Sequence, residues 1–388
     1  MRRRSSLFGA MALMSVFCAV QAFAQAGNLG SWATKPSMPS PRANGAVCLI
    51  GRNIYYAAGY NSGNPTKTLF IYNLDTKTWK SGANLPVALH HIGNGVTVGG
   101  KLYVMGGDTH GDSNSPKPGG AEHTGTSWAL QYDPATDQWK NLKSMIQTTA
   151  TCAITAFKDK IYVMGGVDSF GIVMAVNQVY DPATDTWKLL KPMPTRRDHP
   201  GAEVHDSLIY VCSGGVRKVN VSAMEAYSPA SDTWYKLADI PTGRSDIGFG
   251  FVNGRFYAFG GEWPGIWDTN EEYDPVTNKW RTVLKMTEVW KALACATVGD
   301  TIYSFGGYLA SGMTARGVAF IPPPNTTALL LPQGKLPKTG FRTLTEGFNI
   351  RFATGQDALG RKTKLSIFPL PSREAQVPAG TRNPEQAK

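Results

Sequence analysis

The stretch IYVMGG (residues 161–166), followed by YDPATDTW (residues 180–187), decides the fold of this 388-residue chain. The first segment is a short apolar run ending in two glycines, which allow close packing at the end of a strand. The second places Asp-Pro in a tight turn, with a tyrosine seven residues before a tryptophan. Together they predict a sheet of four short strands. A single such sheet cannot bury its own apolar face.

The same two landmarks recur along the chain. The apolar run reaches its last glycine at Gly59, Gly107, Gly166, Gly215, Gly261 and Gly307. The aromatic pair recurs as Tyr72/Trp79, Tyr132/Trp139, Tyr180/Trp187, Tyr227/Trp234 and Tyr273/Trp280. The glycines are 46 to 59 residues apart, a period typical of repeat architectures in which neighbouring copies bury each other.

This pattern resembles the kelch repeat family over residues 32–324. The resemblance implies an all-β fold, a six-bladed β-propeller with one blade for each glycine landmark. The sixth repeat ends at GVAFIPPP (residues 317–324) without a tryptophan of its own. Trp32, in GSWATKPSMPSPR (residues 30–42), is followed by residues like those at the end of the other repeats, but no repeat precedes it. We therefore expect the N-terminal segment to supply the outer strand of the sixth blade and to close the ring, which removes exposed sheet edges.

The N-terminus predicts a cleavable signal peptide over residues 1–26. Three arginines precede an apolar run too short to span a membrane, and small residues suited to cleavage follow. We therefore expect a secreted or periplasmic protein with the propeller at residues 27–331. Residues 332–388 form a basic extension, expected to be partly ordered by a hairpin around DALGR (residues 357–361) and then disordered.

Charge and cysteine content narrow the class of protein. Of the formal net charge of +11, the signal peptide contributes +3 and the extension contributes a net +6, which leaves +2 for the propeller. This balance indicates neither a nucleic-acid partner nor a membrane surface. The spacing of the cysteines after the signal peptide indicates no disulfide framework, and we expect buried free thiols at Cys48, Cys152, Cys212 and Cys295.

The connections between repeats contain the candidate binding residues. Alignment on an apolar residue four positions earlier gives one equivalent position per blade: Arg42, Leu89, Thr149, Arg197, Arg244 and Trp290. Beside these positions lie Asn44, His90, His91, Asp198, His199, Asp246 and Lys291. Two interpretations are open, because the arginines either bond loop carbonyls within the scaffold or form a cationic ring at the channel mouth that suits carboxylate or phosphate.

Tryptophans outside the repeat motif favour ligand binding on the face that carries these connections. Trp128, Trp263, Trp267 and Trp290 fall in or beside the loops there, and indoles near water provide stacking platforms for sugar rings. The alternative is that they plug the channel. The predicted ligand-binding set is Arg42, His90, His91, Arg197, His199, Arg244, Asp246, Trp263, Trp267, Trp290 and Lys291. Its expected ligand is an acidic small molecule or glycan, or a partner protein, which makes the chain an extracytoplasmic binding module.

A second resemblance supports an enzymatic alternative. The periplasmic sialic-acid mutarotases are six-bladed kelch proteins in which a glutamate follows one glycine landmark, with Pro-Gly and then arginine soon after. Glu262, Pro264 and Gly265 match that motif, whereas Trp267 stands where the arginine would be. The resemblance implies a sugar isomerase or mutarotase of the N-acetylneuraminate type with Glu262 as general base.

The longest repeat contains an insertion, DTHGDSNSPKPGGAEHTGTSW (residues 108–128). Long loops on rigid scaffolds often carry function. Its candidate cation ligands are Asp108, His110, Asp112, Glu122 and His123. Their spacing matches no recognised ligand set, so we expect a solvated lid and neither a metal site nor a cofactor.

Overall fold

The computed structural model describes residues 29–111, 121–323, 354–356 and 362–364. The chain divides into two units, Met1–Pro332 and Gln333–Lys388. Residues 1–26 and most of the predicted extension lie outside the described residues. In the second unit, β32 (Thr354–Gln356) pairs with β33 (Lys362–Lys364), so two strands flank the expected turn. No helix in the described part of the chain is long and apolar enough to cross a membrane.

The described part of the first unit contains six four-stranded antiparallel sheets. The first consists of β2 (Ala46–Ile50), β3 (Asn53–Ala57), β6 (Leu69–Asn73) and β7 (Thr78–Gly82). The second consists of β8 (Val96–Val98), β9 (Lys101–Met105), β10 (Ala129–Asp133) and β11 (Gln138–Asn141). The third consists of β12 (Ala153–Phe157), β13 (Lys160–Met164), β14 (Asn177–Asp181) and β15 (Thr186–Leu189).

The remaining three sheets follow the same order of strands. The fourth consists of β16 (Gly201–His205), β17 (Leu208–Cys212), β20 (Met224–Ser228) and β21 (Thr233–Lys236). The fifth consists of β22 (Gly248–Val252), β23 (Arg255–Phe259), β24 (Asn270–Asp274) and β25 (Lys279–Thr282). The sixth consists of β27 (Ala294–Val298), β28 (Thr301–Phe305), β31 (Gly317–Ile321) and β1 (Ser31–Lys35).

In the described part of the first unit, two-residue strands form three further small sheets in the loops between the long strands. β4 (Tyr60–Asn61) pairs with β5 (Asn64–Pro65), and β18 (Gly215–Val216) pairs with β19 (Val219–Asn220). β29 (Tyr308–Leu309) lies between β26 (Trp290–Lys291) and β30 (Gly312–Met313). Each pair or triplet includes the chain that follows a glycine landmark.

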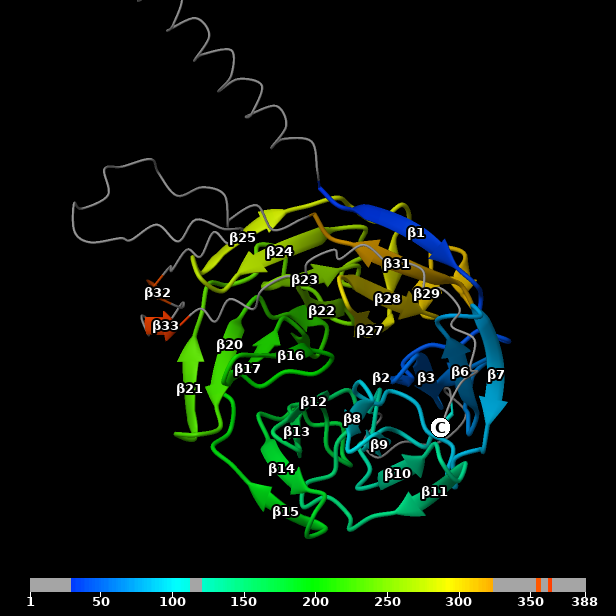
Figure 1. The fold of residues 1–388 in the computed structure, drawn as a ribbon. Coiled ribbons are helices and arrows are strands. Elements are labelled where there is room, and N and C mark those ends of the chain that lie inside the picture. Colours follow the sequence, from blue (N-terminus) through cyan, green and yellow to red (C-terminus); the bar gives the residue numbers. More distant parts are fainter. Residues whose placement is uncertain (1–28, 112–120, 324–353, 357–361, 365–388) are drawn as a thin grey trace, which may run out of the picture. The chain divides into compact units, whose positions relative to one another are not determined.

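The sheets follow one another around the unit in chain order. Their first strands lie toward the centre, as Figure 1 shows for β2, β8, β12, β16, β22 and β27. Each of these strands contacts the next, and β27 contacts β2. Side chains between neighbouring sheets form the cores. One such core joins Val47 and Tyr56 of the first sheet to Ala294 and Phe305 of the sixth. The all-β architecture predicted from the repeats is therefore confirmed.

The tyrosine–tryptophan spacing has a local cause. In the third sheet, Tyr180 lies directly opposite Trp187, and their ring centroids are 5.0 Å apart. The turn between them places Asp185 in the left-handed region (φ 50°), where its carboxylate accepts a hydrogen bond from the Tyr180 hydroxyl at 2.6 Å. The same carboxylate accepts a bond from the Lys143 backbone N–H at 3.0 Å, which links the third sheet to the chain leaving the second.

The motif tryptophans form a second link between neighbouring sheets. Each indole N–H donates to a carbonyl in the chain that leaves the preceding sheet. The pairs are Trp79–Pro36, Trp139–Ala83, Trp187–Lys143, Trp234–Lys191, Trp280–Ala238 and Trp32–Leu284. Trp32 lies in β1, which pairs with β31 so that Trp32 faces Phe320. The sequence placed Trp32 in the outer strand of the sixth repeat, and that is where β1 lies.

The four cysteines of the described chain are free and buried, which confirms the expectation of unpaired thiols. Burial disfavours the thiolate and raises the pKa of each of these four residues to about 12. They are therefore core side chains and not reactive nucleophiles.

The tyrosine-bound aspartates make stability sensitive to acid. The tyrosine hydroxyl and then a backbone N–H lower the pKa of Asp137, Asp185 and Asp232. A carboxylate with a lowered native pKa contributes stability above its unfolded pKa, about 4, and loses that contribution as pH falls through the native pKa. The fifth sheet has Asn278 in the same role, accepting from Tyr273 at 2.8 Å.

We therefore expect the triple variant Asp137→Asn, Asp185→Asn, Asp232→Asn to keep its hydrogen bonds and to lose part of this acid sensitivity. Thermal midpoints at pH 6 and pH 3 measure the effect. The drop between the two pH values should be smaller for the variant than for the wild type. An identical drop in both proteins would show that these carboxylates do not couple folding to protons.

Candidate functional site

Two features of each repeat meet at one end of the sheets, and we call this end the loop face. The first is the connection between sheets, and the second is the chain after the glycine landmark. They pair in the same way in each repeat: Ala43–Tyr60, His90–Asp108, Ala150–Val167, Asp198–Gly215, Ser245–Glu262 and Lys291–Tyr308. Both segments therefore emerge at the same end of the sheets in each repeat.

The connections place one residue per repeat around the centre of the loop face. These residues all have left-handed backbones, with φ between 48° and 57°, and we call them the inner ring: Asn44, His91, Thr151, His199, Asp246 and Ala292. Backbone hydrogen bonds join neighbours in the ring. The Thr151 N–H donates to the His91 carbonyl, and the His199 N–H donates to the Thr151 carbonyl, both at 2.7 Å.

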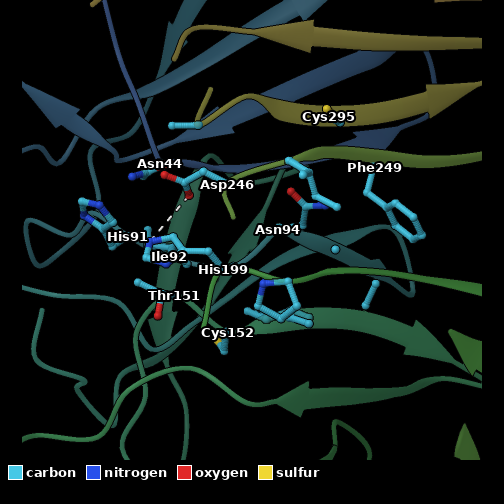
Figure 2. Close-up of a pocket in the computed structure, with 18 of the residues that line it drawn as sticks. Asn44, His91, Ile92, Asn94, Thr151, Cys152, His199, Asp246, Phe249 and Cys295 are labelled. Atoms are coloured by element: carbon cyan, nitrogen blue, oxygen red, sulfur yellow. Dashed lines mark ion pairs between the residues drawn. The ribbon is translucent and has the colours of Figure 1, made fainter. Parts of the chain in front are cut away.

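The inner ring lines a central cavity of about 70 Å³. Figure 2 shows its polar members, with His199 directed toward Asp246, while Phe249, Cys152 and Cys295 form part of the apolar wall. The His199 Nε2 atom is 3.6 Å from an Asp246 carboxylate oxygen. This polar entrance above an apolar wall is the innermost part of the site.

The arginines of the connections do not face this cavity. Arg197 is fully buried, donates to the carbonyls of Ser213 (3.1 Å) and Ala223 (2.6 Å), and pairs with Glu225 at 2.6 Å. Burial lowers the pKa of Arg197, and the Glu225 carboxylate opposes that shift. Its charge is used within its own sheet.

Arg244 and Arg42 are buried in the same way. Arg244 pairs with Glu271, and Arg42 donates to the Thr68 hydroxyl and the Pro41 carbonyl. The predicted cationic ring is corrected accordingly, and the scaffold alternative describes these three side chains. The residues that face the cavity lie two positions further along each connection. Of these, Thr151 and Ala292 were not among the candidates named from the sequence.

Two other predicted ligand residues are also structural. Trp290 occupies the arginine position of its connection, is 1% exposed, and donates its indole N–H to the Gly306 carbonyl at 2.7 Å. His90 is buried, and its ring bonds the ring of His91 and the His110 carbonyl. Both side chains are buried and bonded within the protein, which favours supporting roles over the predicted ligand contacts.

A larger cavity of about 370 Å³ opens beside the inner ring, and we call it the loop-face cavity. Its polar and aromatic lining residues come from six segments: Glu122, His123, Phe170, Asp198, His199, Arg217, Lys218, Ser245, Glu262 and Trp263. His199 lines both cavities. Of the predicted site residues, this cavity brings together His199, Glu262 and Trp263. The insertion contributes its last residues to the wall, whereas Asp112 lies outside the described residues.

Most charges around the loop-face cavity are paired. Glu262 forms an ion pair with Lys291, and Lys218 lies 3.8 Å from Glu122 and 5.0 Å from the Trp263 ring centroid. Trp267 does not line the cavity, but its indole N–H donates to the Trp263 carbonyl at 3.1 Å and supports that residue. These contacts hold Trp263 and its neighbours at the rim.

Two neighbouring carboxylates shift the pKa of His199. Burial alone would lower the pKa of His199, but Asp246 and Asp198 raise it to about 9. Burial in turn raises the pKa of Asp246 to about 6, and the His199 charge opposes this shift. The pair therefore favours a protonated imidazole between two carboxylates when no other cation is present.

Arg217 is an exposed charge of the cavity wall that forms no ion pair in the described part of the chain. It lies at the tip of the β18–β19 hairpin, where Arg217 (φ 49°) and Lys218 (φ 66°) both adopt left-handed backbones. Such turns favour Asn-Gly, and a larger residue in this region costs about 1–2 kcal/mol. In the described part of the chain, the Arg217 guanidinium has no hydrogen-bond or ion-pair partner. Sequence analysis missed it, although two basic residues at a tight hairpin tip are an unusual choice for a turn.

A buried aspartate fixes the start and end of the insertion. Asp108 accepts bonds from the backbone N–H groups of His110 (2.9 Å) and Thr124 (3.0 Å). Burial alone would raise the pKa of Asp108, but these bonds and the nearby His90 lower it to about 2. This anchor brings His123 beside His91 and His199. Among the described residues, these three imidazoles form the group that could hold a metal ion.

Comparison with known proteins identifies the repeats. The model described as the KLHDC2/KLHL20/DRC7 Kelch-repeats domain matches residues 90–307, and the Kelch motif model matches residues 41–86. The chain belongs to the Kelch-repeat family. This Kelch-repeat chain also resembles the solved structure titled "Structure of YjhT", with a TM-score of 0.61 and 16% identity over 74% of this chain and 95% of that one. That likeness supports the propeller type of fold.

Individual relatives of this Kelch-repeat chain differ in length and name. It is 26% identical over 323 residues to Kelch-like protein terF of Aspergillus terreus, covering 76% of this chain and 68% of that protein. It is 32% identical over 164 residues to N-acetylneuraminate epimerase of Pasteurella multocida, covering 42% and 39%. It is 29% identical over 201 residues to Kelch repeat and BTB domain-containing protein 12 of Danio rerio, covering 47% and 31%. The matches thus span less than half of the last two relatives.

Proposed function

We propose that this chain is an extracytoplasmic binding module, a closed six-bladed Kelch propeller that takes an acidic ligand in its loop-face cavity. The ligand class is a sugar acid or another small carboxylate. The extracytoplasmic setting rests on the arginine-led apolar segment at residues 1–26, whose order is that of a signal peptide.

Three observations support six blades and closure. The described first unit contains six four-stranded sheets, and their first strands contact one another in a cycle that returns from β27 to β2. The indole N–H of Trp32 donates to the Leu284 carbonyl at 3.2 Å, as the other motif tryptophans do to their preceding sheets. In this proposal the N-terminal strand completes the sixth blade and ties the last sheet into the ring.

The observation that carries the ligand class is the Arg217 guanidinium. It lies exposed on the wall of a polar cavity whose other charges are largely paired. A guanidinium presents a rigid fork of donors that matches a carboxylate, and charge-assisted bonds of this kind are among the stronger protein–ligand contacts. The strained turn at Arg217 also suggests function, because such strain collects at binding sites.

Trp263 and the cavity size favour a sugar. A cavity of about 370 Å³ lies within the range of small-ligand sites, about 300–1,000 Å³. Trp263 at its rim offers a ring face for stacking, as indoles do in sugar sites. The relative named N-acetylneuraminate epimerase bears the name of a sugar acid, which makes sugar acids the first ligands to test.

We expect Arg217→Asn to weaken sugar-acid binding about tenfold or more. Hydrogen bonds to charged groups contribute about 1.5–3 kcal/mol. Asparagine tolerates the left-handed backbone at this turn, so the fold should be preserved. Calorimetric titration with N-acetylneuraminate and glucuronate, together with the thermal midpoint, measures both effects.

Lys77→Asn is the matched control. Lys77 is also a basic residue with a left-handed backbone (φ 56°), but it lies in a tyrosine–tryptophan turn and does not line the cavity. Its removal should leave affinity unchanged. Equal affinities of Arg217→Asn and wild type would refute the role of Arg217. Silence of the wild type across sugar acids would instead favour a partner protein, for which Phe170 (67% exposed), Ile172 (51%) and Val219 (68%) offer apolar contacts.

A second candidate is a sugar epimerase with Glu262 as general base. It is favoured by the position of Glu262 on the wall of the loop-face cavity and by the epimerase relative. In the same titrations, anomer exchange catalysed by the wild type and abolished by Glu262→Gln with retained affinity would establish it. Saturable binding with no exchange would leave the binding module as the function.

A further inference from the structure

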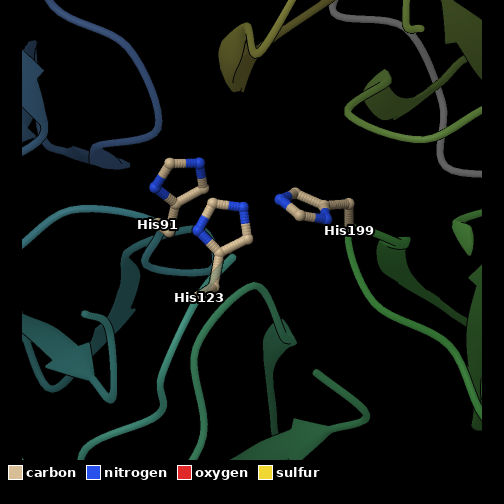
Figure 3. Close-up of side chains that lie close together, drawn as sticks. All are labelled: His91, His123 and His199. Carbon is tan, nitrogen blue, oxygen red and sulfur yellow. The ribbon is translucent and has the colours of Figure 1, made fainter. Parts of the chain in front are cut away.

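Three imidazoles lie close together, as Figure 3 shows, and two of them line the loop-face cavity. His91 and His199 belong to the inner ring, and His123 comes from the end of the insertion. One ring nitrogen from each lies within 4.8 Å of the others. The ring centroids of His91 and His123 are 3.9 Å apart, and those of His91 and His199 are 5.7 Å apart. Segments distant in sequence therefore deliver one side chain each to the same point.

The contacts of His91 favour a metal-binding tautomer. The His90 Nε2 atom lies 2.5 Å from the His110 carbonyl, which can only accept, so this nitrogen carries a hydrogen. In neutral His90 the other nitrogen, Nδ1, is then an acceptor. It bonds Nδ1 of His91, which must therefore donate. The lone pair of neutral His91 is consequently on Nε2, and such outer partners orient metal-bound histidines in general.

His123 is held in place through the adjacent residue. Thr124 donates its backbone N–H to the Asp108 carboxylate at 3.0 Å and its hydroxyl to the same carboxylate at 3.2 Å. Asp108 also accepts from the His110 backbone, so one buried carboxylate binds both ends of the insertion. The position of His123 is thereby tied to the element that supports His91.

His199 lies between two carboxylates that suit an added cation. Asp198 is 3.5 Å from Nδ1, and Asp246 is 3.6 Å from Nε2. Both carboxylates are largely buried, with side chains 16% and 10% exposed. Carboxylates beside a ligating imidazole orient the ring and compensate the charge of the metal.

We propose that His91, His123 and His199 bind a divalent transition-metal ion of the Zn²⁺ class. Three imidazoles suit zinc, copper, nickel and iron, and a site with three protein ligands leaves a position for water or a ligand. Bond lengths of about 2.0–2.1 Å require nitrogens about 3.4 Å apart in a tetrahedral site, so modest side-chain rotations complete the geometry. Because His123 and His199 line the loop-face cavity, the remaining position is available to a molecule bound there.

The test uses the purified full chain without an affinity tag, stripped with a chelator. Zn²⁺ is titrated by calorimetry, and Co²⁺ is added to read the visible absorption bands of a tetrahedral site. The wild type should bind one equivalent of Zn²⁺. His91→Asn and His199→Asn, which suit left-handed backbones, should each weaken binding about a hundredfold or more. His123→Asn provides a third variant outside the inner ring.

His205→Asn is the matched control. His205 is at the end of β16, where its ring stacks on Phe251 at 4.4 Å, and it belongs to neither cavity lining. It should bind Zn²⁺ as the wild type does. The thermal midpoint in chelator shows whether each variant is folded, and His123→Asn decides the outcome if an inner-ring variant unfolds.

The proposal is overturned if the wild type shows no saturable binding of Zn²⁺ or Co²⁺, or if the histidine variants bind as tightly as His205→Asn. Metal binding by the three histidines does not require the proposed acidic ligand. Arg217→Asn should leave Zn²⁺ affinity unchanged, so failure of sugar-acid binding and failure of metal binding are distinguished within the same set of proteins.

Discussion

Arg244→Met is expected to destabilise the chain by about 3–5 kcal/mol, the range measured when one partner of a buried ion pair is removed. Arg244 is fully buried, and its guanidinium donates to the carbonyls of Gly260 (2.7 Å), Thr242 (2.7 Å) and Ala258 (3.0 Å). It also pairs with Glu271 at 2.5 Å. Methionine fills much of the space but leaves a buried carboxylate and three carbonyls without these donors. Urea unfolding followed by circular dichroism measures the loss.

Two controls separate charge from packing. The double variant Arg244→Met, Glu271→Met removes both charges and should recover part of the lost stability, because no unpaired carboxylate remains buried. Arg52→Met removes an exposed arginine paired with Asp75, and exposed pairs contribute little. If Arg244→Met were as stable as the wild type yet lost affinity for sugar acids, Arg244 would be a ligand residue after all.

Gly166→Ala is expected to destabilise the chain by about 2–5 kcal/mol, combining backbone strain with overpacking. Gly166 has φ +86°, a region that side chains rarely adopt. A Cβ added there would lie 2.2 Å from the Ala150 carbonyl oxygen and 2.2 Å from the Thr149 hydroxyl oxygen. The carbonyl belongs to the neighbouring connection, so the clash cannot be relieved by a flexible side chain. Thermal and urea unfolding measure the effect.

Gly299→Ala separates the two causes. Gly299 also has a left-handed backbone (φ +60°), but a Cβ added there meets nothing within 4 Å. Its substitution should cost about 1 kcal/mol from backbone strain alone. The excess loss in Gly166→Ala then measures the close approach of the connection to the glycine landmark. Equal losses of stability in both variants would mean that glycine is needed at position 166 only for its backbone conformation and not for the close approach of the connection.

The repeats could be predicted from the sequence because each is stabilised by contacts between residues close together in the chain. Tyr180, Asp185 and Trp187 satisfy one another within a single turn, so their spacing alone predicts a strand–turn–strand unit. The double glycine likewise reports a conformation that few other residues adopt. These short-range rules recur in each repeat and identified the strands, the all-β class and the loop face. They also anticipated the position of Trp32 in β1 beside β31.

The candidate site was only partly readable. The alignment of the connections selected positions such as Arg197, whose side chain turns into its own sheet. The predicted set also included three residues of the inner ring: His91, His199 and Asp246. His199 lies two residues further along than Arg197, has a left-handed backbone, and lines the central cavity. Arg217 was missed because nothing local marks a hairpin tip as part of a cavity wall. His123 was considered as a cation ligand only together with its sequence neighbours.

The sequence by itself determined the repeat, its strands and the packing residues, because those depend on contacts between residues close in the chain. The tertiary structure alone decided which polar side chains meet. His91, His123 and His199 come from separate loops, and they converge because the sheets bring their connections to one centre. Whether an arginine becomes a ligand or a scaffold residue likewise depends on which donors and acceptors the neighbouring strands offer, and no spacing along the chain encodes that.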